Sequence, residues 1–345
     1  MYLRCQIIKN PIMDSHFTHS FPDVMRDKTI LYVHGFASSG QSGTVSSLRQ
    51  LLPESRIIAP DLPIHPSEAL ALLRRVCEEE HPSLIIATSM GGMYAETLRG
   101  IDRILVNPAF EMGQTILKNN MLGKITFLNP RSDGQQEFLM TKQLQSEYQW
   151  ATEQCFVGKD QETALVYGLF GIEDPTVHTF PLFSSHYPSA LRFHGEHRLN
   201  DSILLHSVLP VVRWIDDAQS QRQRELLYIS IEQTIEREGR PLPSVQKAYE
   251  ELLNHYDIYF VASLPANDVT YGSRWQEWVF ETFGVASYHH LILTNRKDLL
   301  YGDFLIDATT ANGSTGFMST RIEFGSAAFK TWDDVRSYFS LMHGD

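Results

Sequence analysis

Short apolar runs alternate with helix-compatible stretches along the first two hundred residues of the chain. Residues 30–33 and 84–86 are continuous apolar runs of strand length, whereas residues 67–80 and 89–98 are compatible with helices. Strands that alternate with helices in this way are typical of a parallel sheet covered on both faces. The pattern therefore predicts an α/β fold for this part of the chain.

A second alternation of the same kind begins near residue 226. A helical stretch is predicted over residues 244–256, and three strands are predicted over residues 226–229, 258–262 and 290–294. The preceding residues, 217–225, are polar and are predicted to form a linker. We therefore expect two α/β domains, a larger one over residues 28–216 and a smaller one over residues 226–345.

The first 27 residues carry no periodic pattern and are predicted to form an N-terminal arm. An alternative is that Met13 is the true start of the chain. Residues 1–10 contain no long apolar core and no cleavage site of small residues, so we predict no signal peptide.

Composition narrows the classes of function. A length of 345 residues with 43% apolar residues allows two well-packed domains. The net charge of −12 argues against nucleic-acid partners and anionic membrane surfaces, which both reward clustered Lys and Arg. The sequence contains no apolar run of about 18 residues, so no membrane-spanning helix is predicted. Three scattered cysteines without a C-x-x-C pattern are typical of a reducing compartment, so we expect a cytoplasmic protein.

The apolar run at residues 84–86 leads directly into a serine flanked by small residues. Ser89 is preceded by Ala87 and followed by Gly91, and the helix-compatible stretch begins at once. A strand, a tight turn centred on a serine and a helix form a nucleophile elbow, which requires small residues two positions before and after the serine. Ala87 stands where glycine is commoner. The pattern predicts that Ser89 is a nucleophile.

The strand predicted over residues 30–33 ends in a loop suited to an oxyanion hole. In α/β-hydrolases one backbone N–H of the hole comes from the loop after this early strand, and the other comes from the residue after the nucleophile. We assign these donors to Phe36 and Met90. His34 lies in the same loop, where shaping the loop is favoured over acting as the catalytic base.

The catalytic acid is expected after a later strand. Residues 164–170 form an apolar run that ends in a turn, Gly171 to Pro175. A carboxylate just past such a strand is where a triad acid belongs. Asp174 is preferred over Glu173, and an ordinary turn aspartate is the structural alternative.

The catalytic base is expected after the next short strand, residues 190–193. His197 follows a glycine in the loop after this strand, whereas His194 is interpreted as a strand-end residue. The resulting order, Ser89, Asp174 and then His197, is the order found in α/β-hydrolases. His197 is expected to take the Ser89 proton, and Asp174 is expected to hold the imidazole in the required tautomer.

With these residues in place, the first domain resembles the small YqiA/YcfP-type α/β-hydrolases, which are compact bacterial esterases. The similar segments are residues 30–44, 57–63, 84–95, 104–110 and 193–198. The resemblance implies hydrolysis of small-molecule acyl esters or thioesters through Ser89, without a metal or an organic cofactor. The chain departs from the family at Ala87 and in the length of residues 111–157, a candidate lid whose aromatic residues have plain packing as the alternative.

The second domain resembles the C-terminal part of haloacid-dehalogenase-type 5′-nucleotidases. The similar segments are residues 228–235, 257–265, 291–307 and 332–339. In that family the first strand ends in D-x-D-x-T, in which the first Asp is the nucleophile and a Mg²⁺ ligand. Here the three motif positions hold Ser230, Glu232 and Thr234. The family's later phosphate- and metal-site positions are matched by Ser263, Lys297, Asp303 and Asp307.

The loss of the first aspartate predicts an inactive second domain. Ser230 cannot form an aspartyl-phosphate, and Mg²⁺ loses a carboxylate ligand. Ser230, Glu232, Ser263, Lys297, Asp303 and Asp307 are therefore interpreted as a vestigial phosphate or metal site. Two alternatives to a serine esterase stay open: a non-enzymatic metabolite- or nucleotide-binding protein, and a Mg²⁺-dependent nucleotidase that acts through the second domain.

Overall fold

The computed structural model describes residues 20–158 and 162–344 of the chain. The chain divides into two compact units, Met1–Asp216 and Asp217–Asp345. Most of the predicted N-terminal arm, including Met13, lies outside the described residues. Its described part packs on the first unit, because Val24 and Met25 are buried and the Phe21 N–H donates to the Leu51 carbonyl at 2.8 Å.

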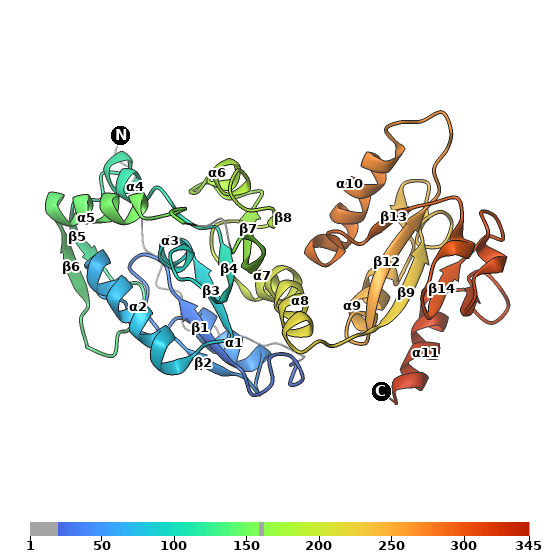
Figure 1. Ribbon diagram of the computed structural model, residues 1–345, viewed down its shortest axis with the longest axis horizontal. Coiled ribbons are helices and arrows are strands. Elements are labelled where there is room, and N and C mark those ends of the chain that lie inside the picture. Colours follow the sequence, from blue (N-terminus) through green and yellow to red (C-terminus); the bar gives the residue numbers. More distant parts are fainter. Residues whose placement is uncertain (1–19, 159–161, 345) are drawn as a thin grey trace. The chain divides into compact units, whose positions relative to one another are not determined.

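The first unit contains a six-stranded sheet in the order β2-β1-β3-β4-β7-β8, in which every neighbouring pair is parallel (Figure 1). The predicted parallel sheet is thus confirmed. Its strands are β1 Thr29–Val33, β2 Arg56–Ile58, β3 Leu84–Thr88, β4 Asp102–Val106, β7 Val166–Gly171 and β8 Ala190–Phe193.

Helices cover both faces of this sheet. Those of the first unit outside residues 111–157 are α1 Gly43–Leu51, α2 Pro66–Glu80, α3 Met90–Glu96, α6 Phe180–Ser184, α7 Asp201–Ile203 and α8 Leu209–Gln219. Helices α1, α7 and α8 lie on one side of the strands, and α2 and α3 lie on the other (Figure 1). Ser47 of α1 donates to Asp201 of α7 at 2.6 Å, which joins two helices of the same face.

Residues 111–157, the candidate lid, form an ordered insertion between β4 and β7. It consists of α4 Met112–Lys118, β5 Gly123–Thr126, β6 Glu137–Met140 and α5 Lys142–Glu153. The strands β5 and β6 pair as an antiparallel hairpin, and α5 packs on both α4 and α2. Phe138 and Tyr148 are buried, whereas Trp150 is 44% exposed. The insertion therefore reaches the core through one apolar side, which includes Met112, Ile116, Phe138, Met140, Leu144 and Tyr148.

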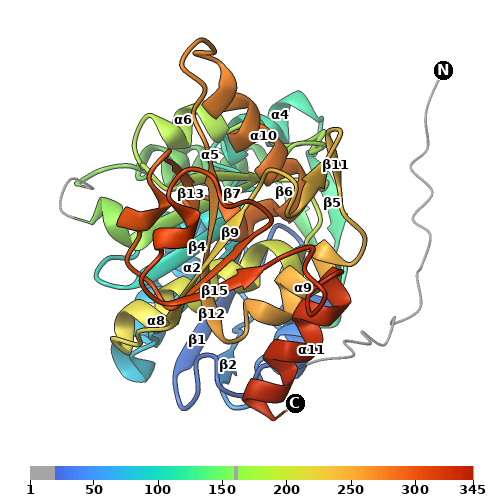
Figure 2. The same ribbon diagram turned by 90° about the vertical axis from the view of Figure 1, so that its right-hand side faces the viewer.

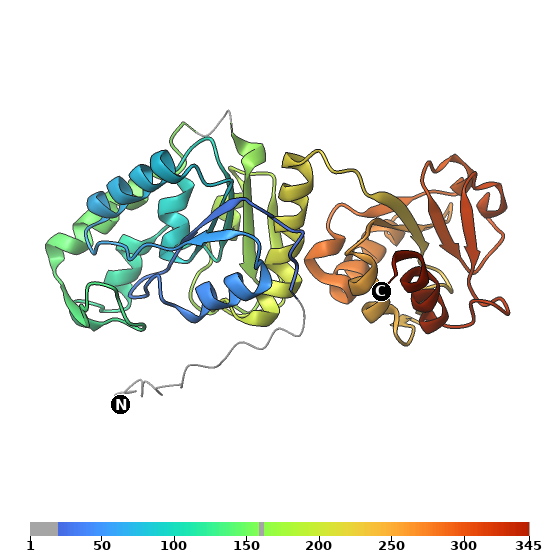
Figure 3. The ribbon, with the colours of Figure 1, turned by 90° about the horizontal axis from the view of Figure 1, so that it is seen from below.

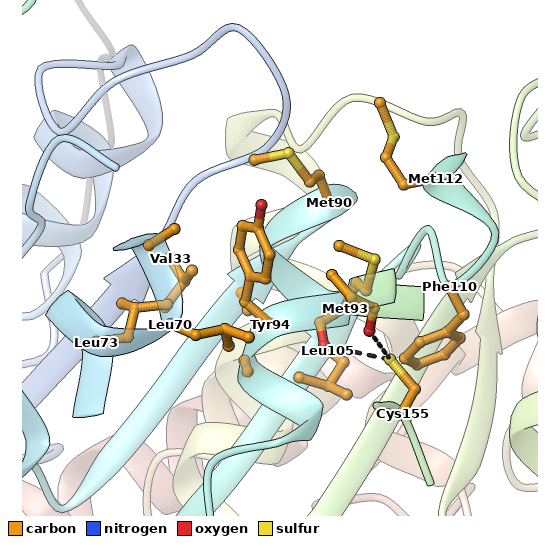
Figure 4. Close-up of a cluster of buried hydrophobic side chains, with 14 of the residues drawn as sticks. Val33, Leu70, Leu73, Met90, Met93, Tyr94, Leu105, Phe110, Met112 and Cys155 are labelled. Atoms are coloured by element: carbon orange, nitrogen blue, oxygen red, sulfur yellow. Dashed lines mark hydrogen bonds between the residues drawn. The ribbon is translucent and has the colours of Figure 1, made fainter. Parts of the chain in front are cut away.

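The core of the first unit surrounds the helix that follows Ser89. All seven residues of α3 are buried, and Figure 4 shows Met93 and Tyr94 among side chains of the neighbouring strands and helices. Cys155 donates its thiol hydrogen to the Met93 carbonyl at 3.5 Å. Burial in apolar surroundings on every side fixes the position of α3 and therefore of the turn before it.

The second unit contains a five-stranded parallel sheet in the order β13-β12-β9-β14-β15 (Figure 2). Its strands are β9 Glu225–Ser230, β12 Tyr256–Ala262, β13 Leu291–Leu293, β14 Phe304–Asp307 and β15 Thr320–Glu323, with a two-residue hairpin of β10 Glu236–Arg237 and β11 Arg240–Pro241. Its helices are α9 Val245–Leu252, α10 Tyr271–Phe283 and α11 Trp332–His343.

Alternate residues of β9 pack on opposite faces of this second sheet. Leu227 and Ile229 join the main core with α9 and α11, which lie side by side in Figure 2. Tyr228 joins a smaller cluster on the other face with Leu305 and Phe317. This period of two is the strand periodicity on which the sequence prediction rested.

The linker between the units is shorter than predicted. Residues 217–219 belong to α8 and Glu225 opens β9, so only residues 220–224 connect the two elements (Figures 1 and 3). Asp217, in the last turn of α8, pairs with Arg224 of the linker at 2.6 Å. Within the described part of the chain, no helix is long and apolar enough to cross a membrane.

Candidate active site

Ser89 lies at the point where the strand order of the first sheet reverses. Strands β1 and β3 are neighbours, yet the chain leaves them toward opposite edges of the sheet. In open α/β sheets, ligands bind outside the carboxyl ends of the strands at such a switch point. The loops after these two strands carry His34 to Gly40 and Ser89.

The backbone at Ser89 has the strained conformation of a nucleophile elbow. Its φ is +52° and its ψ is −122°, a region that non-glycine residues rarely adopt. A Cβ on Gly91 would lie 2.2 Å from the carbonyl oxygen of Val33, so only glycine fits there. Ala87 has no exposed surface. The predicted strand, turn and helix are therefore confirmed.

The structure brings the three predicted triad residues into one chain of hydrogen bonds. Ser89 Oγ lies 3.0 Å from His197 Nε2, and His197 Nδ1 lies 2.8 Å from Asp174 Oδ2. The other carboxylate oxygen of Asp174 accepts from the N–H groups of Thr176 and Val177 at 2.7 and 3.1 Å. The Asp174 side chain is 1% exposed and that of His197 is 23% exposed. This geometry allows His197 to accept a proton from Ser89.

The alternative acid and base form a separate pair. Glu173 Oε1 lies 3.0 Å from His194 Nδ1, and its Oε2 accepts from the Gly195 N–H at 2.6 Å. Both side chains are about half exposed. Bonding by His194 lowers the pKa of the Glu173 carboxyl below its usual range.

The loop after β1 packs directly against the serine. A Cβ on Gly35 would lie 3.2 Å from Ser89 Cβ, and the next residue is Phe36. Met90 is the first residue of α3, where a helix leaves its N–H without an intrahelical partner. Phe36 and Met90 thus flank Ser89 on two backbone segments, as the assignment of an oxyanion hole requires.

His34 shapes this loop, as the sequence favoured. Its Nε2 accepts from the Leu62 N–H at 3.1 Å, so its Nδ1 carries the hydrogen and donates to the Gly35 carbonyl at 2.9 Å. Burial lowers the pKa of His34 below its ordinary value. The neutral ring is held by two backbone groups, and it has no contact with Ser89 Oγ among those described.

The insertion is tied to the loop that carries Phe36. The Leu128 N–H donates to the Ala37 carbonyl at 2.7 Å. The Phe36 ring makes edge contacts with Phe138 and Tyr148 at centroid distances of 5.8 and 6.0 Å. The insertion therefore packs on the loop that carries Phe36, and two of its aromatic residues, Phe138 and Tyr148, supply part of that packing.

Asp61 joins the same two segments, and sequence reasoning missed it. One carboxylate oxygen accepts from the Gly40 N–H at 2.8 Å, and the other accepts from the Ser132 N–H and hydroxyl at 2.6 Å each. Partial burial raises the pKa of Asp61, but these bonds outweigh it and hold the pKa below the usual range. The signal available in the sequence was a carboxylate directly after the strand at residues 56–58.

Asn107 was also missed. It follows β4 and makes side-chain hydrogen bonds to Gly171, Glu196 and His197, which lie in the two loops that carry the acid and the base. Its place at the carboxyl end of a central strand was the available signal.

In the second unit, three of the six vestigial-site residues meet at the carboxyl ends of β9 and β14. Lys297 Nζ donates to Asp307 Oδ2 at 2.7 Å and to Ser230 Oγ at 2.9 Å. The three residues are 2%, 0% and 0% exposed, respectively. The ammonium group of Lys297 thus lies where it neutralises the single buried carboxylate.

Glu232 and Ser263 form a second contact nearby. Glu232 Oε1 accepts from the Ser263 N–H at 2.9 Å and from the Tyr271 hydroxyl at 3.2 Å. The Ser263 hydroxyl accepts from Asn312 at 2.7 Å. The hydrogen-bonding groups expected to hold a phosphate are therefore bonded to this chain's own side chains.

Asp303 does not belong to this site, and that part of the prediction is wrong. It precedes β14, and its carboxylate accepts from the Leu226 N–H at 2.8 Å, at the amino end of β9. Ser230 and Asp307 lie at the opposite ends of these strands. Asp307 lies four residue steps beyond Asp303 along extended chain, a distance of about 13 Å.

The residues of the second unit do not fit a Mg²⁺ ion. The position of the missing aspartate holds a hydroxyl, and the one carboxylate beside it is paired with Lys297. Magnesium requires oxygen ligands with at least one free carboxylate. Among residues 20–158 and 162–344, no group of three or more His, Cys, Asp or Glu residues is arranged to hold a metal ion.

Curated relatives match about a third of the chain. A protein of Vibrio phage KVP40 named "Putative 5'(3')-deoxyribonucleotidase" is 36% identical over 104 residues, which cover 29% of this chain and 59% of that protein. A protein of the same name from Staphylococcus aureus strain Mu50 is 25% identical over 107 residues, which cover 28% of this chain and 58% of that protein. The chain thus spans under two thirds of the length of these relatives.

Solved structures and one family model match the first part of the chain more broadly. The esterase RhEst1 from a Rhodococcus species is 14% identical, with a TM-score of 0.31 over 56% of this chain and 90% of that chain. The thioesterase domain of the curacin biosynthetic pathway is 15% identical, with a TM-score of 0.34 over 57% of this chain and 92% of that domain. The sheet order and elbow described above identify the first unit as an α/β-hydrolase fold, and within it residues 29–165 match the model of the uncharacterised protein family UPF0227.

Proposed function

We propose that the first unit is a serine hydrolase that cleaves small-molecule carboxylic esters or thioesters. The observation that carries this proposal is the unbroken hydrogen-bond chain from Ser89 Oγ through His197 to Asp174. A serine hydroxyl is a weak nucleophile until an adjacent base takes its proton, and the base works only in the correct tautomer. The strained φ of Ser89, which presents the hydroxyl at the carboxyl end of a central strand, adds independent support.

In the proposed reaction, Ser89 Oγ bonds to the acyl carbon as its proton passes to His197 Nε2. The tetrahedral intermediate collapses, the bond to the alcohol or thiol breaks, and the imidazolium gives its proton to that leaving group. A water molecule then attacks the acyl carbon as its proton passes to His197. The bond from that carbon to Ser89 Oγ breaks, the carboxylic acid leaves, and the imidazolium returns its proton to Oγ. Asp174 stays ionised throughout and stabilises the imidazolium.

The N–H groups of Phe36 and Met90 are proposed to hold the negative oxygen of each tetrahedral intermediate. Such donors stabilise charge that exists only during the reaction, and the loss of one typically costs about 3 kcal/mol of the barrier. Because both are backbone donors, their positions depend on the turn at Ser89 and on the loop fixed by His34 and the hairpin.

A fluorophosphonate probe tests the proposal directly, because it forms a covalent bond only with an activated serine. The full chain is expected to be labelled, and Ser89→Ala and His197→Ala are expected to abolish labelling and the hydrolysis of p-nitrophenyl esters. Ser146→Ala is a matched control, since Ser146 is an exposed serine on α5 bonded to its own helix. Absence of labelling in folded wild-type protein would contradict the proposal. A series of acyl chain lengths would then define the substrate.

For the second unit we propose a structural or binding role without phosphatase activity. The Lys297, Asp307 and Ser230 network supports this, because the Asp307 carboxylate is already paired with the lysine that bonds Ser230. The nucleotidase name of the curated relatives supports the alternative. Mg²⁺-dependent release of phosphate from nucleotides by the Ser89→Ala protein would favour that alternative, whereas its absence would favour the proposed role.

A further inference from the structure

Asn107 is a buried residue with an unusual backbone at the carboxyl end of β4. It is 2% exposed and its φ is +45°, a left-handed conformation that asparagine tolerates better than most residues. Its Oδ1 accepts from the Gly171 N–H at 2.7 Å. Its Nδ2 donates to the carbonyls of Glu196 and His197 at 3.1 and 3.2 Å. The side-chain amide of Asn107 therefore both accepts and donates hydrogen bonds.

These bonds join the loop of the acid to the loop of the base. Gly171 opens the turn that carries Asp174, whose N–H donates to the Gly171 carbonyl at 3.3 Å. One of the accepting carbonyls belongs to His197 itself. The two loops are also in close contact, since a Cβ on Gly171 would lie 2.4 Å from the Gly195 carbonyl oxygen. One side chain, directly after a third strand, thus bonds both loops in addition to the bonds that they make with each other.

We infer that Asn107 is a positioning residue for the catalytic triad, an inference that rests on the proposed serine hydrolase function. It touches no reacting atom and acts through the backbone of His197 and of Gly171. An error of about 1 Å in the placement of a catalytic group is sufficient to cost about 100-fold in rate. Only an amide meets the local demand, because an aspartate would turn an oxygen toward two carbonyl oxygens and an aliphatic side chain would leave three backbone groups unbonded.

Two substitutions separate this role from simple packing. Asn107→Gly removes the side chain while accepting the positive φ without strain. Asn107→Asp keeps the size and the acceptor for Gly171 but loses the donor toward the His197 loop. Asn120→Gly is the matched control, because Asn120 also has a positive φ, +49°, and is exposed at the end of α4.

The test compares the rate constant for fluorophosphonate labelling of Ser89, measured well below each melting temperature. Both Asn107 variants are expected to react about 10- to 100-fold more slowly than the wild type, with kcat for a p-nitrophenyl ester reduced and KM changed less than about two-fold. The Asn120→Gly protein is expected to match the wild type. A purely structural role would lower the melting temperature and leave the rate constant of the folded protein unchanged.

Wild-type rate constants in both folded Asn107 variants would therefore overturn the inference while leaving the proposed function intact. A wild-type protein that is folded but inert toward the probe would instead overturn the proposed function, and this inference would fall with it. Should Asn107→Gly not fold, the isosteric Asn107→Asp variant decides the question alone.

Discussion

The carboxylate of Glu173 lies 3.0 Å from Nδ1 of His194, the same arrangement that its neighbour Asp174 makes with His197 at 2.8 Å. Two adjacent acids thus each bond the Nδ1 of a different histidine. They differ in their surroundings: the Asp174 side chain is 1% exposed, whereas that of Glu173 is 48% exposed. The buried pair continues to the hydroxyl of Ser89, which lies 3.0 Å from His197 Nε2.

This duplication gives a matched comparison. We expect Asp174→Asn to lower kcat about 10⁴-fold, because the amide fails to hold the tautomer that the base requires. Glu173→Gln is expected to change kcat less than about three-fold, since Gln keeps an acceptor for the Gly195 N–H and the pair is exposed to solvent. Steady-state hydrolysis of p-nitrophenyl esters measures both. Equal losses in the two variants would show that the wrong acid had been assigned.

His34 makes the stability of the first unit depend on pH. Burial lowers its folded pKa below the ordinary value near 6.5, so the unfolded chain binds a proton that the folded protein does not. Stability is therefore full above about pH 6.5 and falls as the pH drops from there toward the lower folded pKa, by up to about 1.4 kcal/mol per pH unit. Urea unfolding between pH 7.5 and about 5 is expected to show a steeper loss for wild type than for His34→Gln. Parallel curves would contradict this.

Asp61 is expected to hold the hairpin on the oxyanion loop. Asp61→Ala removes the acceptor for the N–H groups of Gly40 and Ser132, so hydrogen exchange at both amides should become at least about 10-fold faster, equivalent to about 1.4 kcal/mol. Asp133→Ala is the control, because Asp133 lies on the same hairpin but bonds only Arg131 and Gln135. Unchanged exchange at Gly40 in the Asp61 variant would show that the loop is held by other contacts.

The buried ion pair of the second unit predicts a strongly non-additive mutation cycle. Lys297→Met leaves the Asp307 carboxylate buried without its counter-charge, which should lower the free energy of unfolding of this unit by about 3–5 kcal/mol. The double variant Lys297→Met/Asp307→Asn removes both charges and is expected to recover more than half of that loss. Hydrogen exchange of β9 in the full-length protein reports this unit separately. Additive losses would contradict the prediction.

The sequence was sufficient for elements whose apolar pattern is continuous. Strands β1 and β3 and helix α2 lie within two residues of their predicted ranges. The two strands are buried apolar runs, whereas α2 buries Ala69, Leu70 and Leu73 at helical spacing. The hairpin of β5 and β6 was not predicted as strands. Each has four residues and one exposed face, as Phe138 at 7% and Leu139 at 61% exposure illustrate, so too few positions carry the period.

The residues of the candidate site likewise fall into those that the sequence predicted and those that it did not. Ser89, Asp174 and His197 follow strand ends in a fixed order, which a linear motif records. Asn107 and Asp61 also follow strands, but they bond backbone atoms of distant loops, and no linear motif records those partners. Asp303 was misplaced for a related reason. It lies before strand β14 and Asp307 lies at its end, so the two side chains are at opposite ends of the sheet.

The bond between Leu128 and Ala37 has a consequence for how a substrate reaches Ser89 in the proposed enzyme. A conventional flap swings aside while the catalytic machinery beneath it stays assembled. Here the hairpin and the loop that carries Phe36 are expected to move together, because Leu128 is bonded to Ala37, the residue after Phe36. We therefore expect that an acyl chain which displaced the hairpin would also disturb the backbone beside Phe36, and that productive substrates bind with the hairpin in place.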